Sequence, residues 1–323
     1  MVYLRRTKKG AGLRRRGPRR RRPRVEITRA RAEHGAGHDC DGPRRHRAQG
    51  PVRRAAARNP PAFSGGVTDL LEEALEQAAN GDSNFSKTLE KIEERHLEPI
   101  RASIPAEKQS SVISFVKAEL NHLETILEGV SMLMEITPKT TAKVTSFGEL
   151  LSSTIIHEIL KNKAIDIVLK DGRKLIETEY QNHKTTVNWE ATQTKIDLFF
   201  KTNTAKITLV PGFVAQDSEG NSSTLGRGGS DFSAAILAYA LDADVLEIWT
   251  DVSGMYTADP KIVKQATPIE KLSYLEAMEL SHFGAKVIYP PTLQPLVEKQ
   301  IPVLIKNTFV PADKGTKIDH IEN

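Results

Sequence analysis

The sequence predicts an α/β protein, a three-layer α/β/α sandwich in which helices cover both faces of a mainly parallel central sheet. Two observations lead to this fold class. Strand-like and helix-like segments alternate through the C-terminal half, and the strand-like ones, such as 205–213 and 245–252, are almost unbroken apolar runs. Strands buried on both faces have this pattern, whereas strands with one wet face alternate apolar and polar residues. Alternating strands and helices produce a parallel sheet between helical layers.

Helical spacing dominates the region before these strands. The segments 67–80, 85–104 and 111–133 carry apolar residues every three or four positions, which is the period of an amphipathic helix. We interpret 85–133 as a helical insertion that serves as scaffold. Its last helix has a single apolar stripe, formed by Val112, Val116, Leu120, Leu123, Leu127 and Val130.

The elements that follow complete the sheet and its helical layers. In sheets of this class, ligands bind beyond the C-terminal ends of the strands, so the polar loops after those ends are candidate sites. We expect strands at 164–170, 205–213, 245–252 and 301–308, and helices at 146–162, 232–241, 273–281 and 292–300.

Charge divides the chain into two unequal parts. Residues 1–60 contain 18 arginines and 2 lysines against 4 acidic residues, a formal charge of +16. Because the whole chain carries +5, residues 61–323 carry −11. The basic segment, defined as 1–62, has no serine and no apolar periodicity. We expect it to be disordered, ahead of a globular domain at 63–318 and a tail at 319–323.

Three interpretations of the basic segment stay open. It is a nucleic-acid-binding arm held by phosphate contacts, an organelle transit peptide, or the product of a frameshifted, fused or mis-started reading frame. Transit peptides are usually amphipathic and rich in serine, which disfavours the second interpretation. The mixture of Arg, Pro, Gly and Ala is typical of GC-rich DNA read out of frame, and we favour the third.

Composition excludes some classes of protein. No stretch of about 18 apolar residues occurs, so the sequence predicts no membrane-spanning helix. The single cysteine, Cys40, excludes a disulfide framework within the chain. The first residues lack the apolar core of a secretory signal. We expect a cytoplasmic protein.

The stretch 223–236, STLGRGGSDFSAAI, concentrates reactive and flexible residues just ahead of an expected helix. Its glycines permit left-handed backbone and close approach of a ligand. Ser230 and Asp231 are good helix N-cap residues, and a helix start favours anions. Arg227, one of four arginines after residue 60, offers a fork that matches a carboxylate or phosphate. The loop is neither a Walker A motif nor GxGxxG, and an ordinary capped turn is the alternative.

Three further clusters carry weaker signals. In 250–260, TDVSGMYTADP, an aromatic residue and carboxylates at a strand end suit a nucleotide, with a loop cap as the alternative. In SFGE, Glu149 near an expected helix start is also explained by the helix dipole. In 283–293, Lys286 lies near an expected helix start, where it holds a phosphate or is merely solvated.

Together, in this order, the clusters resemble aspartate kinases of the amino-acid kinase family. The resemblance implies ATP-dependent phosphorylation, with Mg²⁺, of the side-chain carboxylate of L-aspartate to 4-phospho-L-aspartate. This reaction is the first step of lysine, threonine and methionine biosynthesis. The helical insertion resembles that of the kinases fused to homoserine dehydrogenase. The matching pieces, within roughly 62–318, are FSGGVTDLL, SFGELLSS, PGFVAQDSEGNSSTLGRGGSDFSAA, TDVSGMYTADP, GAKVIYPPTL and IPVLIKNTF.

The resemblance also implies roles for individual residues. Arg227, which would clamp a carboxylate, and Asp231, which would organise the active site, are the catalytic candidates. Glu149 would bind the α-amino group of the substrate. No residue is assigned as a metal ligand. The implied aspartate site is Thr68, Glu149, Phe213, Arg227 and Ser230, and the implied ATP site is Thr250, Asp251, Tyr256, Asp259 and Lys286.

The first sixty residues depart from the family pattern. Aspartate kinases begin with a strand, the motif KFGGTS and a second apolar strand, whereas arginines fill residues 1–60 here. We therefore expect the N-terminal strands to be absent and the sheet to have an unpaired edge. We also expect impaired catalysis, because loss of one transition-state donor commonly costs about 10²–10³ in rate. FSGGVTD has one glycine more than the usual FSGVTD, as if a junction lay near residue 65.

Two other functions remain as alternatives: a catalytically inactive aspartate-binding remnant, and a nucleic-acid binder acting through the arginine-rich arm. The sequence ends near the point where the family's regulatory ACT domains would start, so we expect no feedback inhibition through such a domain. A homodimer formed through the catalytic domain is a further expectation.

Overall fold

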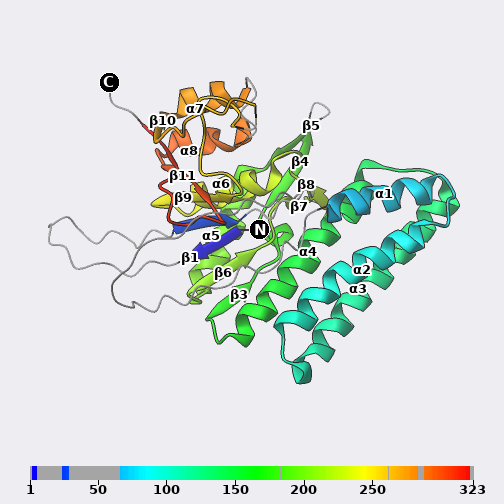
Figure 1. Ribbon diagram of the computed structural model, residues 1–323. Helices are drawn as coiled ribbons and strands as arrows, with labels where there is room; N and C mark the ends of the chain where they lie inside the picture. The colour runs from blue at the N-terminus through cyan, green and yellow to red at the C-terminus, as the bar shows by residue number, and fades with distance from the viewer. Residues whose placement is uncertain are drawn as a thin grey trace.

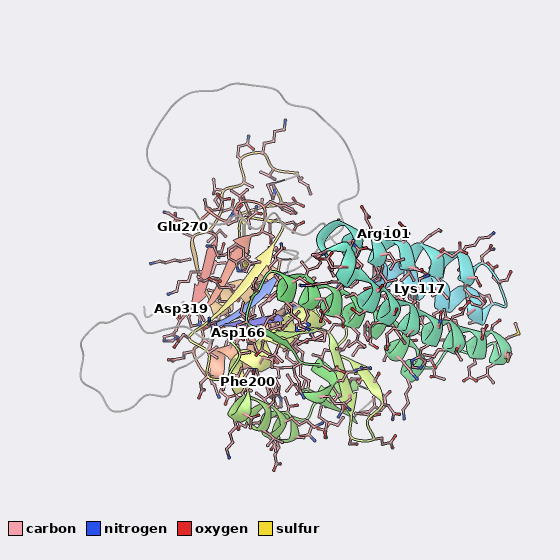
Figure 2. The ribbon with its side chains drawn as sticks, turned by 90° about the horizontal axis from the view of Figure 1, so that it is seen from below. Arg101, Lys117, Asp166, Phe200, Glu270 and Asp319 are labelled. Carbon is pink, nitrogen blue, oxygen red and sulfur yellow. The ribbon has the colours of Figure 1, made fainter. Side chains whose placement is uncertain are left out.

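The structure is a computed structural model that describes residues 2–5, 24–28, 66–181, 184–260, 262–282 and 287–320. Its elements form a domain built on a large sheet and a helical bundle that projects to one side of it (Figure 1). Seen from below, Arg101 and Lys117 lie on the bundle, while Glu270 and Asp319 lie on the opposite side of the molecule (Figure 2).

Eight strands form the large sheet, in the order β10-β12-β11-β9-β2-β1-β6-β3. Parallel pairing joins β2, β9 and β11, and also β3 and β6. This mixed but mainly parallel sheet confirms the predicted α/β class. The strands are β1 (Val2–Arg5), β2 (Arg24–Thr28), β3 (Ile167–Leu169), β6 (Ile207–Val210), β9 (Val245–Thr250), β10 (Lys271–Ser273), β11 (Val303–Asn307) and β12 (Thr316–Asp319).

The prediction that the N-terminal strands are absent is wrong. Two short strands from the basic segment, β1 and β2, occupy the centre of the sheet between β9 and β6. Val2 is 0 % exposed and Leu4 is 3 % exposed, and both belong to the core of this domain. The physical reason is that unpaired backbone groups between two buried strands are costly, so even a four-residue apolar segment gains by filling the gap. The other residues of 1–62 lie outside the described part of the chain.

Strand β1 runs against the direction of its neighbours. It is antiparallel to β2 and to β6, with Val2 opposite Val210 and Arg5 opposite Ile207. The beginning of β1 therefore lies at the edge where β6 ends, and its last residue lies at the opposite edge. Arg5, the last residue of β1, therefore lies at the edge opposite the one at which ligands bind in parallel sheets.

Helices pack against the large sheet. Helix α6 contacts β1, β2 and β9, with α5 and α8 beside it, whereas α4 contacts β3 and β6 and α7 contacts β10 and β12. The helices of this domain and its two 3₁₀ turns are α5 (Trp189–Thr202), α6 (Gly229–Ala240), α7 (Tyr274–His282), α8 (Gln294–Glu298), η1 (Gly172–Lys174) and η2 (Pro290–Thr292).

A second, four-stranded sheet was not anticipated. Its order is β5-β4-β7-β8. The strand expected at 205–213 is shorter in the structure: β6 of the large sheet ends at Val210, the chain turns at Gly212 and Phe213, and β7 of the small sheet begins at Val214. The strands are β4 (Glu177–Gln181), β5 (Lys184–Val187), β7 (Val214–Asp217) and β8 (Ser222–Thr224).

The bundle has four helices and its own hydrophobic core. The apolar stripe predicted in 111–133 is confirmed, because all six of its residues are buried on α3. The helix expected at 146–162 starts earlier, at Pro138, since Thr137 caps it by accepting a hydrogen bond from the Thr140 N–H at 3.1 Å. The four helices are α1 (Val67–Ala79), α2 (Phe85–Ser103), α3 (Ala106–Leu133) and α4 (Pro138–Asn162).

Candidate active site

The glycine–arginine loop lies at the start of α6. The helix begins at Gly229 with Gly228 as its N-cap, so Ser230 and Asp231 lie inside the first turn and are not caps as predicted. Gly228 has φ of +69°, and a Cβ there would lie 2.4 Å from the Cβ of Tyr289. Only glycine satisfies both the left-handed backbone and this close approach, which leaves Arg227 exposed in front of the helix start.

Asp231 supplies a buried carboxylate to the same helix start. It is 1 % exposed and lies in the first turn of α6. The N-terminus of a helix interacts favourably with negative charge. Ser230 beside it is half-buried. The start of α6 therefore combines an exposed guanidinium and a half-buried hydroxyl with a buried carboxylate behind them.

The turn after β6 is clamped to this helix. Phe213 adopts φ of +71°, a left-handed conformation that costs a residue other than glycine about 1–3 kcal/mol. Its N–H donates to Ser233 Oγ at 2.8 Å, and its carbonyl accepts from the Leu225 N–H at 2.8 Å. Ser233 in turn donates to the Gly229 carbonyl at 2.8 Å. Strain held in place by several contacts is typical of functional sites.

Two predicted site residues come from the bundle. Glu149 is half-buried in the middle of α4, so the explanation of its charge by a helix start is wrong. Thr68 is exposed in the first turn of α1. Helices α4 and α1 are in contact next to Glu149 and Thr68. A Cβ on Gly148 would lie 3.2 Å from side-chain carbons of Val67 and Leu71. Helix α4 also packs against β8, the strand that leads into the arginine loop.

A second polar cluster lies where β9 and β11 end. Thr250 is 2 % exposed, and its hydroxyl donates to Asp251 Oδ1 at 2.9 Å. The Thr250 carbonyl accepts from the Thr308 N–H at 2.8 Å, which ties the two strand ends together. Tyr256 is half-buried and forms an isolated bridge with Pro268, and Asp259 is exposed. Thr250 and Asp251, which are adjacent in the chain, therefore lie at the end of β9 beside the end of β11.

Sequence reasoning missed three residues of this second cluster. Asn307, 8 % exposed at the end of β11, donates through Nδ2 to Ser253 Oγ at 2.9 Å. Ser253 donates to the carboxylate of Asp313. The signal available was an asparagine directly after an apolar strand, IPVLIKN. Lys286, assigned to the same site, lies outside the described residues.

The described residues contain neither a membrane-spanning helix nor a cluster of metal-binding side chains. No helix among them is long and apolar enough to cross a membrane. No group of three or more His, Cys, Asp or Glu side chains in the described ranges is arranged to hold a metal ion.

The described residues thus form a mainly parallel sheet with helices packed on it, a glycine–arginine loop at the start of α6 and a polar cluster at the ends of β9 and β11. Residues 62–307 match the amino acid kinase family, and the chain belongs to that family. Among its relatives are the bifunctional aspartokinase/homoserine dehydrogenase of Buchnera aphidicola, 38 % identical over 68 % of this chain and 26 % of the relative, and lysine-sensitive aspartokinase 3 of Escherichia coli, 32 % identical over 79 % of this chain and 56 % of the relative.

Solved structures give the same result. Aspartokinase III of E. coli in complex with aspartate and ADP matches with a TM-score of 0.71 and 30 % identity, over 80 % of this chain and 56 % of that one. Aspartate kinase of Clostridium acetobutylicum matches with a TM-score of 0.64 and 28 % identity, over 79 % of this chain and 54 % of that one. The chain thus spans little more than half the length of its single-function relatives, and 28 % of the bifunctional enzyme of Arabidopsis thaliana.

Proposed function

We propose that this chain is the catalytic domain of an aspartate kinase, which transfers the γ-phosphoryl group of ATP to the side-chain carboxylate of L-aspartate. The observation that carries the proposal is the pairing at α6: an exposed Arg227 in front of the helix start, and the strained Phe213 turn bound to the same helix. The aspartate and ADP bound by the similar E. coli enzyme support it.

The residues around α6 are the proposed acceptor site. Arg227 binds a carboxylate of aspartate through its planar fork, and Glu149 on α4 binds the α-amino group. Ser230, Thr68 and the Phe213 turn complete the pocket. Asp231 is not a substrate clamp in this proposal: its buried carboxylate organises the first turn of α6 and orients the groups around it.

The ends of β9 and β11 are the proposed ATP site. Thr250, Asp251, Tyr256 and Asp259 surround the nucleotide, and Lys286 meets its phosphates. Mg²⁺ is normally bound by one or two carboxylates together with substrate phosphates, so we expect it to arrive with ATP and assign it no protein cage. Phosphoryl transfer then depends on alignment and on neutralising the phosphate charge.

We propose that this chain transfers the phosphoryl group more slowly than its single-function relatives do. The KFGGTS motif is not found in the sequence, and β1 runs antiparallel, so Arg5 at its end lies at the edge opposite the proposed site. Loss of one preorganised donor commonly costs about 10²–10³ in rate. We place the reaction in the cytoplasm, at the start of lysine, threonine and methionine biosynthesis.

The test is ATP-dependent formation of aspartyl hydroxamate by the purified chain, together with L-aspartate binding by calorimetry. Arg227→Ala is compared with Arg101→Ala, which removes an exposed arginine of the bundle that pairs with Glu94. Turnover lost only in Arg227→Ala supports the kinase. Binding without turnover, lost only in Arg227→Ala, supports the inactive aspartate-binding remnant instead. Absence of both from folded protein contradicts the proposal.

A further inference from the structure

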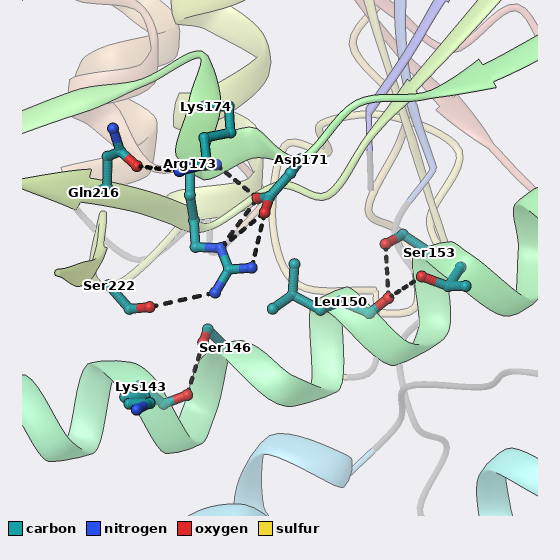
Figure 3. Close-up of polar contacts among 10 residues, drawn as sticks. Lys143, Ser146, Leu150, Ser153, Asp171, Arg173, Lys174, Gln216 and Ser222 are labelled. Atoms are coloured by element: carbon teal, nitrogen blue, oxygen red, sulfur yellow. Dashed lines mark hydrogen bonds and ion pairs between the residues drawn. The ribbon is translucent and has the colours of Figure 1, made fainter. Parts of the chain in front are cut away.

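Asp171 and Arg173 form a rigid ion pair beneath the small sheet (Figure 3). Arg173 Nε donates to Asp171 Oδ1 at 3.1 Å and to Oδ2 at 3.0 Å, and Nη2 donates to Oδ2 at 2.8 Å. Asp171 Oδ1 also accepts from the Arg173 N–H at 2.9 Å, which caps η1. The two side chains are 31 % and 29 % exposed. Such a fork holds the guanidinium in one plane, which a lysine ammonium cannot do.

Gly172, between these two residues, packs directly on the strained turn. A Cβ at Gly172 would lie 2.6 Å from the Pro211 carbonyl oxygen and 3.2 Å from that of Val214. These carbonyls flank Gly212 and Phe213, the turn that is bound to α6. The backbone of η1 therefore packs directly on the Phe213 turn, and any side chain at position 172 would push the two apart.

Arg173 also reaches the strand that leads to the arginine loop. Its Nη1 donates to Ser222 Oγ, at the start of β8, at 3.4 Å. The next residue of β8 is held as well, because the Thr178 hydroxyl donates to Ser223 Oγ at 2.9 Å. Figure 3 shows the guanidinium of Arg173 facing Ser222, with the turn of α4 that carries Ser146 below it in this view. Two residues after β8 the chain enters the loop that bears Arg227.

We propose that Asp171, Gly172 and Arg173 are a positioning unit for the acceptor site. Gly172 packs on the Phe213 turn, and Arg173 holds Ser222 at the start of β8. Through β8 the unit fixes the loop that carries Arg227, without contact with the substrate. The identity of the ligand rests on the proposed function, but the mechanical role does not. The unit acts on the acceptor side alone, since its contacts reach β7, β8 and the turn before them and none of the described contacts reaches Thr250 or Asp251.

The first test measures hydrogen–deuterium exchange in the full chain without ligand. Arg173→Lys keeps the charge but loses the fork, and we expect amide exchange to rise about tenfold or more in peptides covering 211–214 and 222–230. The reason is that the ion pair that fixes η1 beside the Phe213 turn is weakened and the hydrogen bond to Ser222 is lost. Peptides of α3 should not change. Arg101→Lys is the matched control, since it alters an exposed arginine–carboxylate pair of the bundle. Unchanged exchange in both segments, or an equal rise everywhere, overturns the proposal.

Two milder variants keep the test valid if Arg173→Lys does not fold. Asp171→Asn weakens the fork and should raise exchange in the same two segments. Ser222→Ala removes only the contact to β8 and should affect 222–230 while leaving 211–214 unchanged. If amide exchange in Ser222→Ala rose only in 211–214, the assignment of the Ser222 contact to β8 and the arginine loop would be wrong.

The second test measures binding by calorimetry, with L-aspartate and with ADP as separate probes. In Arg173→Lys we expect the Kd for L-aspartate to rise about 10-fold or more, while the Kd for ADP stays within about 2-fold. A parallel loss of both affinities indicates general damage and overturns the acceptor-side role. If the unaltered chain binds no aspartate while the exchange result holds, the proposed function fails and the positioning role stands.

Discussion

The helical bundle and the centre of the large sheet differ in how far their sequences specify them. The bundle repeats one apolar stripe over many turns, and each residue of the stripe on α3 is buried. The sheet centre instead takes in β1 and β2, two strands of four and five residues from a segment dominated by arginine. The comparison teaches that a periodic segment specifies its own structure, whereas a short strand is specified by the gap that it fills.

Truncating the buried side chain of Leu4 in β1 is the strongest test of this difference between the two regions. Leu4 is 3 % exposed, so Leu4→Ala should lower the free energy of unfolding by about 2–5 kcal/mol. Leu198→Ala, at a position 69 % exposed, is the matched control and should change it by less than about 0.5 kcal/mol. Urea denaturation measures both. Equal, small effects would show that β1 contributes nothing to the core.

Adding one methyl group at Gly228 tests whether the loop that carries Arg227 needs its close contact with Tyr289. Gly228→Ala places a side chain against Tyr289 at a residue with φ of +69°. We expect a loss of about 1–3 kcal/mol from backbone strain alone, together with loss of aspartate binding, because α6 must move. Thermal unfolding and calorimetry test the two parts. Aspartate affinity retained in a stable Gly228→Ala chain would exclude a role for this loop in binding.

The bundle should respond to acid through one buried histidine. His96 is 0 % exposed, Nδ1 donates to the Ile92 carbonyl at 2.7 Å, and Nε2 has no hydrogen-bond partner within the described ranges. Burial lowers the pKa of His96 below its usual value of 6.5, and the nearby charge of Arg95 lowers it further.

Below about pH 6.5 the unfolded chain therefore binds more protons at His96 than the folded chain does, and the free energy of unfolding falls as the pH falls, by at most about 1.4 kcal/mol per pH unit. Urea denaturation at pH 7 and pH 5 measures this slope. His96→Gln should reduce it, whereas His122→Gln, at an exposed position of α3, should not. Identical slopes in all three chains would exclude His96 as the source.

The smallest expected effect is a stabilisation, in contrast to the losses of stability predicted above. Gly129 lies in the interior of α3, and a Cβ there would meet nothing within 4 Å. Gly129→Ala should raise the free energy of unfolding by about 0.5–1 kcal/mol, because glycine loses more backbone freedom in a helix. Thermal unfolding measures it next to Gly228→Ala. A destabilised Gly129→Ala chain would mean that the helix is not formed as described.

The sequence by itself determined the α/β class, the apolar stripe of α3, and the loop of Gly226 to Asp231 at a helix start, because each depends on neighbours within a few positions. Only the tertiary structure decided three other features: that α6 begins at Gly229, where the cap is set by the contact with Tyr289; that β1 and β2 pair between β9 and β6; and that Gly172 supports the Phe213 turn. Each of these depends on contacts between segments distant in the chain, whose steric limits and unpaired backbone groups no local pattern records.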